Sequence, residues 1–211
     1  MSYYEDKKFL GIWKYNTDNS ILSIEKTGEV YMCFWKNSYT DDENKYLGIG
    51  IFVDNQLLIS RYSAQVPGGG IGLYKPIGDL RSNSSLWAST QNPDILGSGI
   101  AIRKNTSESF EGSYKVRYFI EGTESPVYDL NISKDDKNDL LYFLNWSIDE
   151  EVKLHGVGMV SNDQLILAWG GVIFDYELII LDIEDNRGNV ILKSKKAVLG
   201  KDTIKEEILT K

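Results

Sequence analysis

The side chains best suited to catalysis near neutral pH each occur once in this chain: His155, a potential general base, and Cys33, a potential nucleophile. No serine lies in a G-x-S-x-G motif, and the sequence offers no triad partner for the histidine. In an internal repeat, Leu47 aligns with His155 and Leu144 with Cys33, so neither position carries chemistry that the copies share. We therefore predict no catalytic residue, and interpret His155 as a surface or rim residue and Cys33 as a small buried hydrophobic residue.

Metal and phosphate sites also lack support. One Cys and one His cannot build a Cys₄, Cys₂His₂ or His₃ zinc centre. The acidic runs 41–43 and 135–139 do not follow the D-x-[DN]-x-[DN]-G spacing of a calcium loop. The glycine-rich run 67–72 lacks the Lys-Ser/Thr of a P-loop and a following helix, so we interpret it as a hairpin. We expect neither a metal ion nor a cofactor.

Aromatic side chains make up 12% of the chain, with 5 Trp and 13 Tyr. By strand alternation Tyr31 and Trp35 lie on one face, and Tyr142 and Trp146 repeat that arrangement. Core packing alone explains such residues. The alternative hypothesis is that they line two related cavities for small, apolar or planar ligands. The candidate ligand-binding residues are Trp13, Tyr31, Trp35, Arg61, Tyr114, Tyr142, Trp146 and Trp169.

β-Strands must position these side chains. Short apolar or alternating segments, separated by Gly, Asn and Asp clusters, predict an all-β protein of antiparallel strands. Turns at Thr27-Gly28 and Asp54-Asn55 contain residues that tolerate positive φ. Only the last eleven residues, 201–211, show a pattern that a helix could use. The expected strands of the first half are 9–16, 20–27, 29–37, 45–53, 56–63, 70–77, 84–90 and 96–103.

The repeat is the strongest pattern in the chain. The segment Phe9-Leu10-Gly11-Ile12-Trp13-Lys14 aligns with Phe110-Glu111-Gly112-Ser113-Tyr114-Lys115. Arg61 and Trp169 occupy matched positions, where we expect the two cavities to differ. The other aligned blocks, in order, are 22–24 with 130–132, 31–35 with 142–146, 48–59 with 156–167, Tyr74 with Tyr176, and 95–97 with 198–200.

Two repeats, 1–104 and 105–211, follow from this alignment, joined by the polar stretch 104–109. Each repeat holds about eight short strands, the number at which an antiparallel sheet closes into a small barrel. We therefore predict two antiparallel meander barrels, one for each repeat. The alternative is one larger continuous barrel to which each repeat contributes half of the strands.

The segment 9–14 resembles the Gly-x-Trp first-strand signature of the calycin group, which comprises lipocalins, fatty-acid-binding proteins and avidins. The second copy keeps Gly112 but has Tyr114 in place of Trp. The resemblance implies a barrel that holds a ligand, with the Trp closing one end and a cation from the last strand packed over it. Arg103 and Lys205 lie where that cation would be sought. The chain departs from the group in holding two copies and shorter strands.

Charge and composition restrict the partners. A net charge of −8 and a sequence pI near 4.8 disfavour nucleic acid and anionic membranes as partners. The N-terminus lacks a secretory-signal pattern, no apolar run reaches the roughly 18–20 residues of a membrane helix, and a single Cys fits a reducing compartment. We therefore expect a cytoplasmic protein. Apolar residues on both faces of 31–35 and 142–146 predict packing between the halves or a homodimer interface.

These observations favour a noncatalytic duplicated barrel that binds a small apolar or planar ligand, or a protein partner. Two other classes stay open at this point. One is an enzyme whose active site lies at a barrel mouth, and the other is a structural or interaction module that uses an outer aromatic surface.

Overall fold

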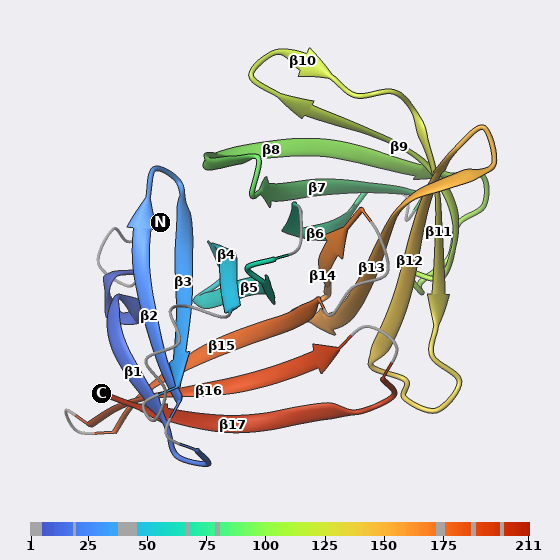
Figure 1. Cartoon of the computed structure of the whole chain (residues 1–211). Coiled ribbons are helices and arrows are strands. Elements are labelled where there is room, and N and C mark those ends of the chain that lie inside the picture. Colours follow the sequence, from blue (N-terminus) through green and yellow to red (C-terminus); the bar gives the residue numbers. More distant parts are fainter. Residues whose placement is uncertain are drawn as a thin grey trace.

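The computed structural model describes residues 6–18, 20–37, 46–65, 68–78, 81–171, 176–186, 189–198 and 201–211. The described chain is all-β and forms two closed eight-strand antiparallel barrels (Figure 1), which confirms the predicted fold class and excludes one continuous barrel. A short 3₁₀ helix, η1 (Asp6–Phe9), precedes the first strand. No helix of the described residues is long and apolar enough to cross a membrane.

Each barrel combines strands from both halves of the sequence. Barrel 1 consists of β1 (Gly11–Tyr15), β2 (Ser20–Thr27), β3 (Val30–Asn37), β4 (Tyr46–Val53), β5 (Gln56–Ser63), β15 (Glu177–Asn186), β16 (Asn189–Val198) and β17 (Ile204–Thr210). Barrel 2 consists of β6 (Gly69–Ile77), β7 (Ser82–Ser89), β8 (Asn92–Arg103), β9 (Gly112–Ile120), β11 (Tyr128–Lys134), β12 (Leu141–Ile148), β13 (Glu151–Ser161) and β14 (Gln164–Gly170). The two-residue strand β10 (Thr123–Glu124) pairs with β9 outside the ring.

The barrels therefore do not divide at residue 104, where the sequence repeats meet. After its fifth strand the first half crosses to barrel 2, and its strands β6, β7 and β8 complete that barrel; β15, β16 and β17 complete barrel 1 in return. The run 67–72, interpreted as a hairpin, is part of the first crossing: Pro67 lies outside the described residues, and Gly69 begins β6. The stretch 104–109 lies within barrel 2, where it connects the paired strands β8 and β9.

The observed strand bounds lie close to the bounds predicted from the sequence, because the turns between strands contain residues suited to positive φ. Asp54 and Asn55 have φ of 49° and 65°, and Asn162 and Asp163, their counterparts, have φ of 51° and 58°. The last eleven residues are the exception to the prediction, since they form strand β17 rather than a helix. The acidic run 41–43 lies outside the described residues.

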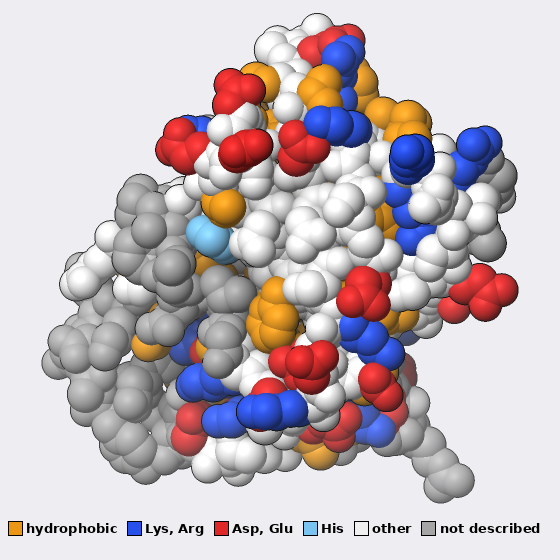
Figure 2. All heavy atoms as spheres, turned by 90° about the vertical axis from the view of Figure 1, so that its right-hand side faces the viewer, with side chains coloured by type: hydrophobic (Ala, Val, Ile, Leu, Met, Phe, Trp, Pro, Cys, Tyr) orange, Lys and Arg blue, Asp and Glu red, His pale blue; other side chains and the backbone are white. Residues whose placement is uncertain are grey.

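An apolar cluster joins the outer faces of the two barrels. Ile49, Ile51 and Leu58 of barrel 1 pack in one buried group with Val157 and Ile166 of barrel 2. Met32 of β3 and Phe143 of β12 pack against the same cluster, so the predicted strand segments 31–35 and 142–146 both contribute to the contact between the barrels. A homodimer interface stays a prediction. On the side of the molecule at the right of Figure 1, acidic and basic side chains are interspersed and hydrophobic ones form small groups (Figure 2).

Two glutamines form hydrogen bonds between the two barrels. Gln164 Nε2 of β14 donates to Asp54 Oδ2 at 2.5 Å, and Gln56 Oε1 of β5 accepts from Ser161 Oγ at 3.2 Å and from Asn162 Nδ2 at 3.3 Å. Each glutamine follows a hairpin turn of its own barrel and reaches the turn of the other.

Replacing Gln164 with alanine removes the bond to Asp54, and we expect the free energy of unfolding to fall by about 1 kcal/mol. Asp54 is exposed, so water compensates part of the loss. Urea denaturation followed by circular dichroism measures the change. The exposed Gln65, changed to alanine, is the matched control, and its effect should stay within about 0.5 kcal/mol. Equal effects of the two changes would refute a role for the Gln164–Asp54 contact.

Candidate functional site

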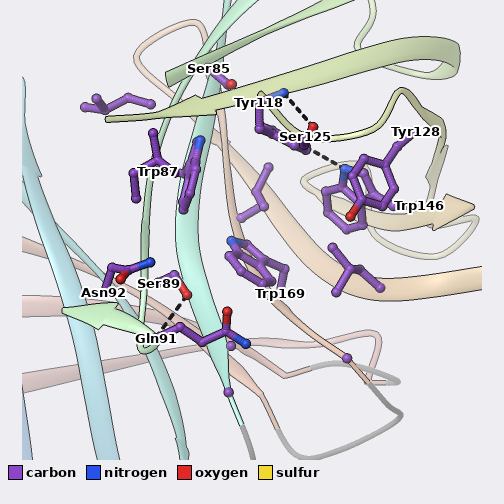
Figure 3. Close-up of a pocket in the computed structure, with 18 of the residues that line it drawn as sticks. Ser85, Trp87, Ser89, Gln91, Asn92, Tyr118, Ser125, Tyr128, Trp146 and Trp169 are labelled. Carbon is purple, nitrogen blue, oxygen red and sulfur yellow. Dashed lines mark hydrogen bonds between the residues drawn. The ribbon is translucent and has the colours of Figure 1, made fainter. Parts of the chain in front are cut away.

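Barrel 2 contains a cavity of about 610 Å³ at one end of its interior (Figure 3). This volume equals that of about 20 water molecules at ~30 Å³ each, and it lies within the range of about 300–1,000 Å³ typical of small-molecule sites. Three Trp and three Tyr side chains dominate its wall: Tyr74, Trp87, Tyr118, Tyr128, Trp146 and Trp169.

The depth of the cavity can be read along β7. Ser89, Trp87 and Ser85 alternate on the inner face, with Ser89 next to the exposed rim residues Gln91 and Asn92, and with Ser85 deepest. Figure 3 shows the same order, with Gln91 and Asn92 at one end and Ser85 beside Tyr118 at the other. Exposed lining residues lie at the β7–β8 turn, Gln91 and Asn92, and in β10, Thr123 and Glu124, so the cavity opens where these segments meet solvent.

Paired tyrosines form the floor. Across neighbouring strands Tyr74 lies opposite Ser85, Ser85 opposite Gly99, and Gly99 opposite Tyr118. The hydroxyls of Tyr74 and Tyr118 are 2.5 Å apart, and Trp146 Nε1 donates to Tyr118 Oη at 2.6 Å. Burial raises the pKa of Tyr118 well above its usual range and also raises the pKa of Tyr74, so both phenols are neutral at neutral pH.

Glycines create the space. Gly72 of β6 lies opposite Leu167, whereas at the matched position of barrel 1 Ile179 lies opposite Ile59. A Cβ atom at Gly72 would lie no closer than 3.4 Å to its neighbours. A small side chain would therefore fit at this position, and the glycine leaves that space empty.

Glycines also let two indole rings lie along the barrel wall. A Cβ atom at Gly70 would come within 2.5 Å of the Trp169 ring, and one at Gly97 within 2.1 Å of the Trp87 ring. Both tryptophans therefore depend on a glycine in the neighbouring strand. The aromatic lining and the glycines form one arrangement.

Barrel 1 has charged side chains at the positions equivalent to this lining. Arg61 Nη1 donates to Glu177 Oε2 at 2.5 Å, and Lys196 Nζ lies 3.4 Å from Glu207 Oε2 and 4.0 Å from Glu177 Oε2. The Arg61 guanidinium also stacks on Tyr46, with its carbon 4.0 Å from the ring centroid.

The strand registers match two of these residues with the lining tryptophans of barrel 2 and the other two with glycines of barrel 2. Arg61 and Glu177 face each other as Trp169 and Gly70 do. Lys196 lies opposite Ile179 as Trp87 lies opposite Gly72, and Glu207 lies opposite Ser194 as Gly99 lies opposite Ser85. An ion-pair network in one barrel thus replaces Trp-Gly pairs in the other. Arg61 therefore pairs with a carboxylate where the matched Trp169 lies against a glycine.

The structure separates the eight sequence candidates into three groups. Trp146 and Trp169 line the cavity. Tyr114 and Tyr142 pack in the buried interior of barrel 2 outside the cavity wall. Trp13, Tyr31 and Trp35 lie in the packed interior of barrel 1, and Arg61 belongs to its ion-pair network. None of these four residues lines the cavity of barrel 2, and their role in ligand binding stays a prediction.

The first strands of the two sequence repeats share one arrangement in the structure. Trp13 Nε1 donates to the Phe9 carbonyl at 2.7 Å, and Tyr114 Oη donates to the Phe110 carbonyl at 2.8 Å. The Arg103 guanidinium lies 5.4 Å from the Tyr114 ring centroid, where a cation was expected. Over Trp13 the cation is Lys211, at 4.9 Å, and not Lys205. Lys205 lies six residues earlier on β17, opposite Lys196.

The two residues suited to catalysis lie away from the cavity. Cys33 is fully buried in the interior of barrel 1, as predicted, and burial raises the pKa of its thiol. His155 is half-buried, with Nδ1 2.7 Å from Asn145 Oδ1, and neighbours the cavity residue Leu154 on the opposite strand face. Among the described residues no group of three His, Cys, Asp or Glu could hold a metal ion.

Sequence reasoning missed Ser85, Trp87 and Tyr118. The sequence did contain a signal for these residues, because Ser85, Trp87 and Ser89 alternate along β7 with the apolar Leu86 and Ala88. Ala88 belongs to the cluster between the barrels, and Leu86 packs against it. The pairing of Tyr74 with Tyr176 was also wrong in register. Leu181 pairs with Leu57 as Tyr74 pairs with Leu165, so Leu181 takes the place of Tyr74.

Comparisons with protein-family models, with curated protein sequences and with solved structures find no match for this chain. The resemblance to the calycin group stays a prediction.

Proposed function

We propose that this protein binds one small, uncharged, planar molecule per chain in the cavity of barrel 2, without chemical conversion. The observation that carries the proposal is the 610 Å³ cavity with its six aromatic side chains. Aromatic faces favour stacked or edge-on contact with flat rings. Barrel 1, with its interior packed by its own side chains, serves in this proposal as the structural half of the molecule.

The charges around the cavity support an uncharged ligand. Glu124 is the only Asp, Glu, Lys, Arg or His among the described lining residues, and it lies at the exposed edge, where it pairs with Arg117 at 2.9 Å. The floor tyrosines are neutral. A ligand with a net charge would lose its hydration there without gaining a charged partner, which is costly.

A direct test replaces Gly72 with isoleucine, the residue at the matched position of barrel 1. The side chain would extend into the cavity, and we expect the affinity for 2-naphthol, a flat two-ring probe that is uncharged at neutral pH, to fall at least about tenfold, or 1.4 kcal/mol. Isothermal titration calorimetry measures the affinity, and native mass spectrometry should count one probe per chain.

The matched control is Gly72→Ala, because a Cβ alone meets only ordinary van der Waals contacts. It should bind 2-naphthol within about threefold of the natural protein. Unchanged binding in Gly72→Ile, or two probes per chain, would rule out the cavity of barrel 2 as the single site.

A further inference from the structure

Ser85 lines the cavity, and its buried hydroxyl has no hydrogen-bond partner among the described residues. The residue as a whole is only 8% exposed. A buried hydroxyl without a partner is costly, because folding removes its bonds to water and returns none.

The neighbours of Ser85 explain why it has no partner. Gly99, directly opposite on β8, has no side chain, and the hydroxyls of Tyr74 and Tyr118 bond to each other. Ser89 lies nearer the rim on the same face, and its hydroxyl does have a partner: Oγ accepts a hydrogen bond from the backbone N–H of Gln91 at 3.1 Å. The unused bonding capacity therefore lies at the inner end of the cavity.

Barrel 1 shows what can occupy the equivalent place. Ser194, the counterpart of Ser85, also has a buried Oγ without a partner, but Glu207 lies opposite it where barrel 2 has Gly99. In barrel 1 the chain's own carboxylate side chain occupies this level. In barrel 2 that side chain is missing, and the same level borders the cavity.

We infer that the ligand of barrel 2 enters with a hydroxyl or carbonyl group first, and that Ser85 Oγ binds this group while the flat part of the ligand contacts Trp87 and Trp169. The inference rests on the proposed function. A serine hydroxyl can donate to a carbonyl or exchange bonds with a hydroxyl, so either group satisfies it. Trp87 lies two residues, or about 6.6 Å, nearer the rim, a span that a molecule of two fused rings covers.

Two probes of nearly the same shape test this role. 2-Naphthol carries a hydroxyl where 2-methylnaphthalene carries a methyl group, and both are flat and uncharged. We expect Ser85→Ala to weaken 2-naphthol binding about tenfold and to change 2-methylnaphthalene binding by less than about twofold, as measured by calorimetry. The matched control Ser194→Ala removes the equivalent hydroxyl of barrel 1 and should leave both affinities unchanged.

Three results would overturn the inference, and they differ in what they say of the proposed function. Unchanged 2-naphthol binding in Ser85→Ala removes the role of the hydroxyl and leaves the site intact. Equal weakening of both probes assigns Ser85 a packing role only. If the natural protein binds neither probe, the proposed function fails together with the inference. Thermal unfolding controls for folding, because the loss of an unpaired buried hydroxyl should not lower the midpoint.

Discussion

Trp13→Ala should lower the free energy of unfolding by about 3–5 kcal/mol, the usual cost of truncating a fully buried tryptophan. The Trp13 side chain is 0% exposed and packs in the buried interior of barrel 1. Its indole donates to the Phe9 carbonyl and lies under Lys211, so truncation leaves a void, an unpaired carbonyl and a displaced cation. Urea denaturation followed by circular dichroism measures the loss.

The protein supplies its own control for this change. Tyr114 holds the matched place in barrel 2 and bonds to the Phe110 carbonyl as Trp13 bonds to that of Phe9. Trp13→Tyr should therefore cost less than about half as much as Trp13→Ala, because the ring and the hydrogen bond can both be kept. A loss below about 1 kcal/mol for Trp13→Ala would show that the packing of Trp13 does not stabilise barrel 1.

Glu177→Leu should destabilise the protein by about 2–4 kcal/mol, because it removes the partner of a largely buried cation. The side chains of Arg61 and Glu177 are 16% and 19% exposed, so water screens the stranded guanidinium only in part. Lys196, close to the same carboxylate, adds a second positive charge that would lose a neighbour. Denaturation of the single and double variants gives the coupling between the two residues.

The double variant Arg61→Leu/Glu177→Leu separates the cost of a stranded charge from the worth of the ion pair. We expect it to lie within about 1 kcal/mol of the natural protein, since replacing a buried ion pair by apolar residues is often neutral. Barrel 2 supports this expectation, because it places the apolar pair Trp169 and Gly70 at the matched positions. If the double variant lost as much stability as the two single variants together, the two charges would not be coupled.

Local patterns explain why the strands could be predicted. The alternating segment 20–27 and the mainly apolar segment 56–63 reproduce β2 and β5 to the residue, because both patterns are local to the strand. Turns such as Asp54-Asn55 end strands by their own conformational preference. The alignment of 48–59 with 156–167 likewise agrees with the equivalent strand pairs of the two barrels.

The site could be predicted only in part. Trp146 and Trp169 stand out as aromatic residues in matched positions, and both line the cavity. Trp13 and Trp35 look the same in sequence but are packed into barrel 1, because the depth of a side chain in a closed barrel depends on the strands opposite it. No local pattern distinguishes a tryptophan that fills a barrel from one that borders a hollow.

The sequence by itself determined the strands, their turns and the duplication, since each depends on residues close together in the chain. Only the tertiary structure decided that the last three strands of each half close the other barrel, because a strand of either copy offers the same pattern of bonds to either neighbour. It also decided where a ligand could bind. Gly72 in place of Ile179 opens barrel 2, through a volume that only the closed ring of strands encloses.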